Sequence, residues 1–204
     1  MTAAEEHLTR DERRRRSEAA ILQAARELFA ESGFERTTIR GVAARAGLDP
    51  ALVMQHYGSK EGLFAAAARW SDDAQSVFSA GRDTIAAAAL SDLLAKFEDA
   101  PDREAAVALM RNCLTHPEAA RIMRDEVMCD RAAAVARALD GDDAELRAGL
   151  VGACMIGIGM ARYLLEIPPL AGASREDVQR LMEPVLRALV HPPAAAGGPP
   201  AATA

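Results

Sequence analysis

Side chains that can bind an anion or hydrogen-bond the edge of a nucleobase gather in residues 47–64, GLDPALVMQHYGSKEGLF. Gln55 can pair bidentately with adenine, and Leu52 can touch a thymine methyl group. His56 can reach a phosphate or a base edge, and the ammonium group of Lys60 can pair with a phosphate. This set of side chains is chemically suited to a DNA groove.

The same segment predicts a very short helix with a clear start and a clear end. Asp49 is a good N-cap residue, and Pro50 fits the first helical position, where its missing N–H group is not needed. Gly58 allows the left-handed stop, and Ser59 caps the next helix at once. The helix between them has about nine residues, a length that is marginal for an isolated helix. Its neighbours must hold it in place, as is common for an element that is presented as a surface.

Two predicted helices precede the short one. The first carries one apolar stripe and ends at Gly33, and the second begins at Thr37 or Thr38 and ends at Gly47. The stripe of the first helix comprises Ile21, Leu22, Ala25, Leu28 and Phe29, and the inward positions of the second are Ile39, Val42, Ala43 and Ala46. Two short helices joined by a tight turn form the pattern of a helix-turn-helix, whose second helix enters the major groove.

The predicted turn also determines which residues of the short helix face outward. Val53 and Tyr57 can pack against Ile39, Val42 and Leu48 and fix the crossing angle. This leaves an outward face made of Ala51, Leu52, Gln55 and His56.

Residues 21–64, ILQAARELFAESGFERTTIRGVAARAGLDPALVMQHYGSKEGLF, strongly resemble the DNA-binding domain of the TetR family of bacterial transcriptional regulators. The joint occurrence of LFAESGFERTTI, VAARAG and HYGSKEGLF carries the resemblance. It implies a dimeric repressor with an N-terminal three-helix DNA-binding domain and a larger helical C-terminal domain for effector binding and dimerisation. It also implies that Thr38, Gln55, His56 and Lys60 fall where the family commonly contacts phosphates or bases.

Two positions depart from the family pattern. Met54 stands where the family often has a tyrosine that reaches DNA, and Asp49 stands where a neutral serine is common. Met54 cannot donate a hydrogen bond, and Asp49 sets a negative charge near phosphates. At the other end of the chain, residues 156–190 resemble the last two helices of one subgroup of these regulators.

The charge distribution agrees with a DNA-binding N-terminal part. The chain has a net charge of −6, but residues 1–70 carry eleven basic against ten acidic residues. The run Arg13–Arg16 could be a solvated helix start or a clamp on the DNA backbone. The expected DNA contacts are Arg13, Arg14, Thr38, Ala51, Leu52, Gln55, His56, Tyr57 and Lys60.

Helical periodicity continues through the rest of the chain, which predicts an all-α protein of about nine helices. Beyond the short helix, they are expected at 60–79, 83–98, 102–114, 117–139, 142–166 and 175–190, with the segment IPPLAGAS as a break. We expect four regions: a disordered N-terminus (1–12), the helix-turn-helix domain (13–64), a helical ligand-binding and dimerisation domain (65–190) and a disordered tail (191–204).

Apolar residues of the C-terminal part could line an effector site or form a dimer interface. Trp70, Phe78, Met110, Met123 and Tyr163 are the ligand-lining candidates for a hydrophobic effector, although apolar residues at helical spacing are ordinarily core. Small residues on one helix and an apolar stripe on the last could build a four-helix interface between two copies. The interface candidates are Gly152, Gly157, Leu181, Val185, Leu186 and Leu189.

Several other functions are disfavoured. We find no G-x-S-x-G, H-E-x-x-H or phosphate-binding glycine loop, so an enzyme is not expected, and no cofactor is implied. Cys113 and His116 lie three apart, but without a second such pair we expect no metal site. Arg162 lies in an otherwise apolar stretch and needs a carboxylate partner, most simply an internal salt bridge.

The N-terminus lacks a signal peptide, and the longest uncharged run, Ala148 to Ala161, has 14 residues and is too short to cross a bilayer. These features predict a cytoplasmic protein. The expected function is a ligand-responsive repressor that binds a pseudo-palindromic operator as a homodimer. The alternative is a helical small-molecule-binding or interaction protein without specific DNA binding.

Overall fold

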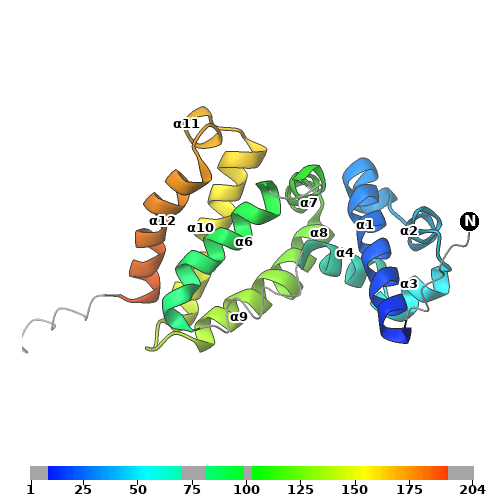
Figure 1. The fold of residues 1–204 in the computed structure, drawn as a ribbon, viewed down its shortest axis with the longest axis horizontal. Coiled ribbons are helices and arrows are strands. Elements are labelled where there is room, and N and C mark those ends of the chain that lie inside the picture. The colour runs from blue at the N-terminus through cyan, green and yellow to red at the C-terminus, as the bar shows by residue number, and fades with distance from the viewer. Residues whose placement is uncertain (1–8, 70–80, 99–102, 193–204) are drawn as a thin grey trace, which may run out of the picture. The chain divides into compact units, whose positions relative to one another are not determined.

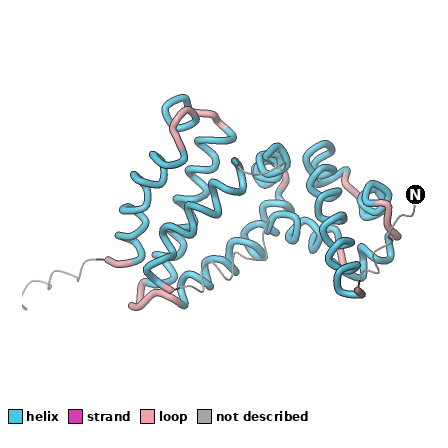
Figure 2. The backbone as a smooth tube through the Cα atoms, in the orientation of Figure 1, coloured by secondary structure: helices cyan, strands magenta, loops and turns pink. Residues whose placement is uncertain are grey.

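The computed structural model describes residues 9–69, 81–98 and 103–192, and within these ranges the chain forms helices and turns but no β-strand (Figure 2). The described residues form two compact units. Unit 1 contains residues 9–69 and 103–127, and unit 2 contains residues 81–98 and 128–192. The all-α fold predicted from the sequence is confirmed.

Unit 1 begins with four helices that bear out the local sequence signals (Figure 1). They are α1 (Arg10–Arg36), α2 (Ile39–Ala46), α3 (Pro50–Tyr57) and α4 (Lys60–Arg69). Asp49 caps α3, as predicted, and of the two expected start residues Thr38 caps α2. Gly47 and Gly58 end these helices with φ values of 68° and 71°, a region that glycine enters without steric cost.

Aromatic rings join α1 to α4, and aliphatic side chains add α2 and α3 to the same core. The Phe64 ring meets the rings of Phe29 and Phe34 edge to face, at centroid distances of 5.0 and 5.1 Å. Such arrangements add to the gain from burying the rings themselves. Val42 of α2 and Val53 of α3 are fully buried in the same core. The short helix α3 is therefore held by its neighbours.

Gly33 interrupts α1 with a φ of 77°, and the backbone groups beside this break need partners from elsewhere. Asn112 of α7 (Arg103–Thr115) provides them. Its amide group donates to the Phe29 carbonyl at 3.0 Å, and its side-chain oxygen accepts from the Phe34 N–H group at 3.0 Å. The buried Asn112 side chain thus replaces helical hydrogen bonds that the break removes.

This contact crosses the predicted domain ranges, which placed residues 65–190 in the C-terminal domain. Instead, α7 and α8 (Pro117–Ile122) belong to unit 1. Leu109 and Ile122 are buried in the same apolar cluster as Phe29. The first three helices cover only part of this core, and α7 and α8 complete it.

Unit 2 is built around three helices that pack against one another, α6 (Ile85–Glu98), α10 (Ala144–Gly159) and α12 (Arg175–Val190) (Figure 1). The 3₁₀ turn Arg82–Thr84 precedes α6, and α9 (Cys129–Arg137) packs against α10. The range predicted for the last helix, 175–190, is confirmed.

Other predicted helices differ in detail. The range 117–139 contains the π-helical turn Met123–Met128, and the range 142–166 ends in the π-helical turn Met160–Leu164. The expected break IPPLAGAS contains the short helix α11 (Pro168–Ala171). The predicted helix 60–79 is described only as far as α4, so its later part lies outside the described residues.

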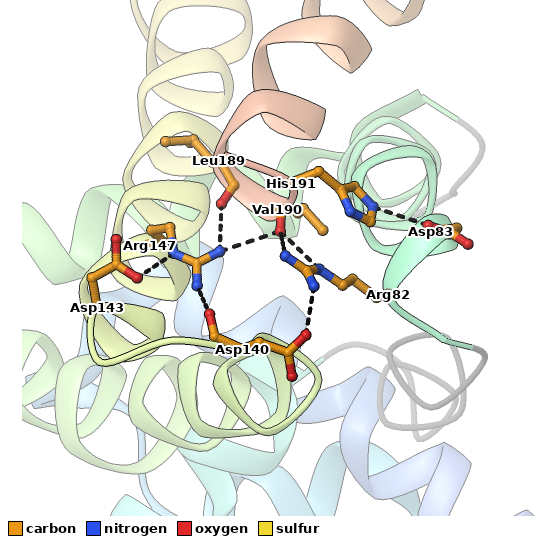
Figure 3. A network of polar contacts seen from close by, with 8 residues as sticks. All are labelled: Arg82, Asp83, Asp140, Asp143, Arg147, Leu189, Val190 and His191. Atoms are coloured by element: carbon orange, nitrogen blue, oxygen red, sulfur yellow. Dashed lines mark hydrogen bonds and ion pairs between the residues drawn. The ribbon is translucent and has the colours of Figure 1, made fainter. Parts of the chain in front are cut away.

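Two arginines fix the C-terminal end of α12 (Figure 3). Arg82 donates from Nε and Nη2 to the Val190 carbonyl at 2.9 and 2.7 Å, and the buried Arg147 donates to the same oxygen at 3.2 Å. Asp140 and Asp143 balance their charges, at 2.7 Å from Arg82 and 2.8 Å from Arg147. Cations stabilise a helix C-terminus because its last carbonyl groups carry partial negative charge.

The internal salt bridge predicted for Arg162 is confirmed. Its Nε and Nη2 atoms donate to Glu98 Oε1 at 3.0 and 2.8 Å, and the Tyr163 hydroxyl donates to the same oxygen at 2.6 Å. Burial, followed by the hydrogen bond to Glu98, raises the pKa of the Tyr163 hydroxyl above its ordinary value.

Replacing Asn112 tests the importance of the Gly33 break. Asn112→Ala leaves the Phe29 carbonyl and the Phe34 N–H group buried without their partner, and we expect the free energy of unfolding to fall by about 2 to 4 kcal/mol. Urea denaturation followed by circular dichroism measures it. Thr115→Ala on the same helix removes an exposed hydroxyl and should change it by less than about 0.5 kcal/mol. Equal effects of the two substitutions would refute the assigned role.

Candidate nucleic-acid interface

The turn between α2 and α3 has a fixed geometry. The Leu48 N–H group donates to the Ala43 carbonyl at 2.9 Å, directly after the left-handed Gly47. The buried Val42 and Val53 pack the two helices into one core. Short helices joined in this way form a helix-turn-helix, with α3 as the helix that can enter a major groove.

The outer side of α3 carries four exposed residues, Pro50, Ala51, Met54 and Gln55, beside the partly buried Leu52. Gln55 is the group here that can read a base edge through two hydrogen bonds. The acidic Asp49 has a local structural task, since its carboxylate accepts from the Ala51 N–H group at 2.7 Å. Its negative charge is used as a helix cap.

His56 lies differently from the prediction. Its side chain is only 12% exposed, and its Nδ1 atom lies 3.2 Å from Glu18 Oε1 of α1. Tyr57 is partly buried against the core of unit 1. Both follow from helical spacing, because positions 56 and 57 lie three and four residues after the buried Val53 and share its face. The outward face of α3 is therefore narrower than predicted.

Lys60, at the start of α4, is held by the turn that follows the Gly33 break. Its Nζ atom donates to the Glu35 carbonyl at 2.9 Å and lies 4.5 Å from the centre of the Phe34 ring. The Glu35 carboxylate in turn lies 2.8 Å from His116 Nε2. An ammonium group has three donors, so Lys60 can keep this anchor and still bind a phosphate.

The remaining DNA-contact candidates lie at exposed positions. Arg13 and Arg14 are exposed on the first turns of α1, where Arg14 pairs with Glu18 at 3.0 Å. Thr38 is exposed, and its hydroxyl oxygen accepts from the Gly41 N–H group at 3.1 Å. The hydroxyl proton remains available to a phosphate.

The candidate effector-binding residues fall in different parts of the chain. Trp70 and Phe78 lie outside the described residues. Met110 and Met123 are partly buried in unit 1. Tyr163 belongs to unit 2, where its ring stacks on Phe97 at 4.5 Å and its hydroxyl bonds Glu98, so it is part of the core of that unit. Their role in binding an effector remains a prediction.

The dimer candidates fall into three groups by their exposure. Leu181 and Val185 are 61% and 48% exposed, and Gly157 is exposed on α10. Gly152 and Leu189 are partly buried. Leu186 is fully buried in unit 2, so its assignment to an interface is corrected: it lies eight residues after the buried Val178, on the inward face of α12.

Sequence reasoning missed several residues that the structure singles out. Glu18, Asn112 and His116 act on parts of unit 1 far from them in sequence, and no local pattern marks such partners. By contrast, the exposed Leu146 and Leu150 of α10 are four residues apart, a helical spacing that was visible in the sequence.

Comparison with known proteins agrees with this architecture. Residues 21–67 match the family described as "Bacterial regulatory proteins, tetR family", and residues 83–190 match "Tetracyclin repressor-like, C-terminal domain". An HTH-type transcriptional repressor of Mycobacterium tuberculosis is 52% identical over 48 residues, or 24% of this chain and 26% of that protein. The chain thus spans about a quarter of the length of the curated relatives it matches.

Solved structures match over a larger part of the chain. A TetR-family regulator from Streptomyces coelicolor is 30% identical, with a TM-score of 0.54 over 90% of this chain and 99% of that one. NalD of Pseudomonas aeruginosa, described as the secondary repressor of the MexAB-OprM multidrug efflux pump, has a TM-score of 0.62 over 86% and 96% of the two chains. At 19% identity, NalD supports the fold alone.

A helix-turn-helix module joined to a helical C-terminal domain on one polypeptide defines the class of one-component transcriptional regulators. The profile matches to both parts and the full-length relative specify the group within this class. The chain belongs to the TetR family.

Substitutions at Gln55 and Lys60 test the assigned interface. Gln55→Ala should cost about 1 to 3 kcal/mol of binding to a selected duplex and relax the preference at one base pair. Lys60→Ala should weaken binding to all DNA sequences alike and reduce the salt dependence of binding by about one phosphate contact. Fluorescence anisotropy at several salt concentrations measures both. Wild-type affinity in both variants would show that α3 and the start of α4 are not the reading surface.

Proposed function

We propose that this protein is a ligand-responsive transcriptional repressor that binds a pseudo-palindromic operator as a homodimer. The observation that carries the proposal is the exposed face of α3, with Gln55 at its centre, on a helix held by the core of unit 1. A single short helix reads only a few base pairs. Useful specificity therefore requires two copies on successive turns of the duplex.

Unit 2 offers a surface for this second copy. Leu146, Leu150 and Ile156 are exposed on α10, and Leu181 and Val185 are exposed on α12, which packs beside it. A soluble monomer seldom leaves several large apolar side chains uncovered on neighbouring helices. Two such helix pairs can cover each other around a twofold axis as a four-helix interface.

The same surface accounts for the apolar character of α10. The segment Ala144–Leu164 has the length and composition of a membrane-spanning helix, with 28% of its most apolar window buried. Arg147 and Arg162 of this segment are buried and ion-paired inside unit 2. An apolar face that pairs with a second copy explains the composition without a membrane, in a protein that acts in the cytoplasm.

The effector is proposed to be a small, mainly apolar molecule bound by the C-terminal helices. Two observations support the proposal. The chain belongs to a family of ligand-responsive regulators, and these helices are rich in alanine and methionine. Trp70 is the single tryptophan of the chain and offers a direct spectroscopic probe. By linkage, any effector that releases DNA must bind less tightly when operator is present, by the same factor.

Charges placed on the apolar surface of α12 test the assembly. The double substitution Leu181→Glu and Val185→Glu should convert a dimer of about 43 kDa, twice the 21.7 kDa chain, into a monomer, because buried unpaired carboxylates oppose association. Sedimentation at micromolar concentration measures the mass, and operator affinity should fall at least about 100-fold.

Leu114→Glu is the matched control, since Leu114 is similarly exposed but lies in unit 1. It should leave the mass and the operator affinity unchanged. A wild-type protein that sediments as a monomer and still binds a specific duplex tightly would contradict the dimeric mode of binding.

A further inference from the structure

Glu18 joins two residues that were assigned to DNA. Its Oε1 atom lies 3.0 Å from Arg14 Nε, one turn earlier on α1, and 3.2 Å from His56 Nδ1 on α3. The Arg14 side chain is 67% exposed and that of Glu18 is 33% exposed, whereas that of His56 is 12% exposed, so the group reaches the surface of unit 1 through Arg14 and Glu18. One oxygen of the Glu18 carboxylate therefore pairs with side chains from both α1 and α3.

These two donors are the kind that a DNA phosphate recruits. Arginine and histidine bind phosphate oxygens through charge-assisted hydrogen bonds of the same length and geometry as those they make to carboxylates. Arg14 lies in the basic start of α1, and His56 lies on the helix that presents Gln55. A DNA phosphate that approaches Arg14 and His56 finds both side chains already paired with the Glu18 carboxylate.

We propose that Glu18 is an intramolecular substitute for a DNA phosphate, which occupies Arg14 and His56 in the free protein and lowers the affinity for every duplex. This inference rests on the proposed function. Binding requires the phosphate to displace Glu18 from these donors or to bind beside its negative charge. Both routes oppose association, and neither depends on base sequence.

The exposure of Arg14 makes the exchange feasible. An exposed ion pair is weak in water, so Arg14 can turn from Glu18 to a phosphate at little cost. The base-reading face is not involved, because Gln55 lies elsewhere on α3. Glu18 therefore reduces the sequence-independent part of binding and leaves the preference for one sequence over another unchanged.

The test is Glu18→Gln, which keeps the shape and removes the charge. Glu31→Gln is the matched control: Glu31 also lies on α1 and pairs with an arginine, Arg45 at 2.6 Å, which is not among the DNA-contact candidates. Both variants remove one negative charge from the same helix. Circular dichroism melting confirms that both fold.

Affinity is measured by fluorescence anisotropy for a selected operator and for a scrambled duplex, across a range of salt concentrations. We expect Glu18→Gln to tighten binding to both duplexes by about three- to tenfold at low salt, with a salt dependence steeper by about one phosphate contact. The ratio of the two affinities should stay constant. Glu31→Gln should change either affinity by less than about twofold, since Glu31 pairs with Arg45, which is not among the DNA-contact candidates.

The gain in DNA affinity from Glu18→Gln should depend on Arg14 and His56, the two donors that the substitution releases. In an Arg14→Ala, His56→Ala background, Glu18→Gln should have no more effect than Glu31→Gln. If the wild-type protein binds its operator and Glu18→Gln binds equally or more weakly, Glu18 is not a phosphate substitute, although the proposed function stands. A wild-type protein that binds no duplex would overturn the proposed function as well.

Discussion

The structure of unit 1 depends on how the break at Gly33 is satisfied. A glycine with positive φ ends the regular hydrogen bonding of α1 inside the protein, and Asn112 of α7 supplies the missing donor and acceptor. The turn after the break then carries Phe34 into the core and offers the Glu35 carbonyl to Lys60. A residue of α7 thereby fixes the backbone that positions a candidate phosphate contact.

This arrangement makes the DNA-reading part more than three helices. The helices α7 and α8 complete its core, and His116 at the start of α8 bonds the Glu35 side chain beside the Lys60 anchor. Movement of α7 or α8 would act on this anchor directly. In unit 2, Arg82 and Arg147 donate to the Val190 carbonyl at the end of α12. They thereby stabilise the helix that carries Leu181 and Val185.

The sequence predicted those features that short-range rules determine. The cap at Asp49 and the stops at Gly47 and Gly58 depend on residues within one turn, and all three are confirmed, while Thr38 is the one of the two expected start residues that caps α2. The burial of His56 could have been predicted from its spacing to Val53. The role of Asn112 could not, because it satisfies backbone groups about eighty residues earlier in the chain, and Leu186 needed the packing of α12 to show which side faces inward.

Selection of bound sequences from a random DNA pool tests directly whether two copies of α3 read one duplex in a symmetric arrangement. We expect enrichment of two inverted half-sites whose centres lie about one helical turn of DNA, or a multiple of it, apart. Each selected duplex should bind an even number of chains. Enrichment of a single asymmetric site that binds one chain, or no enrichment at all, would contradict the account.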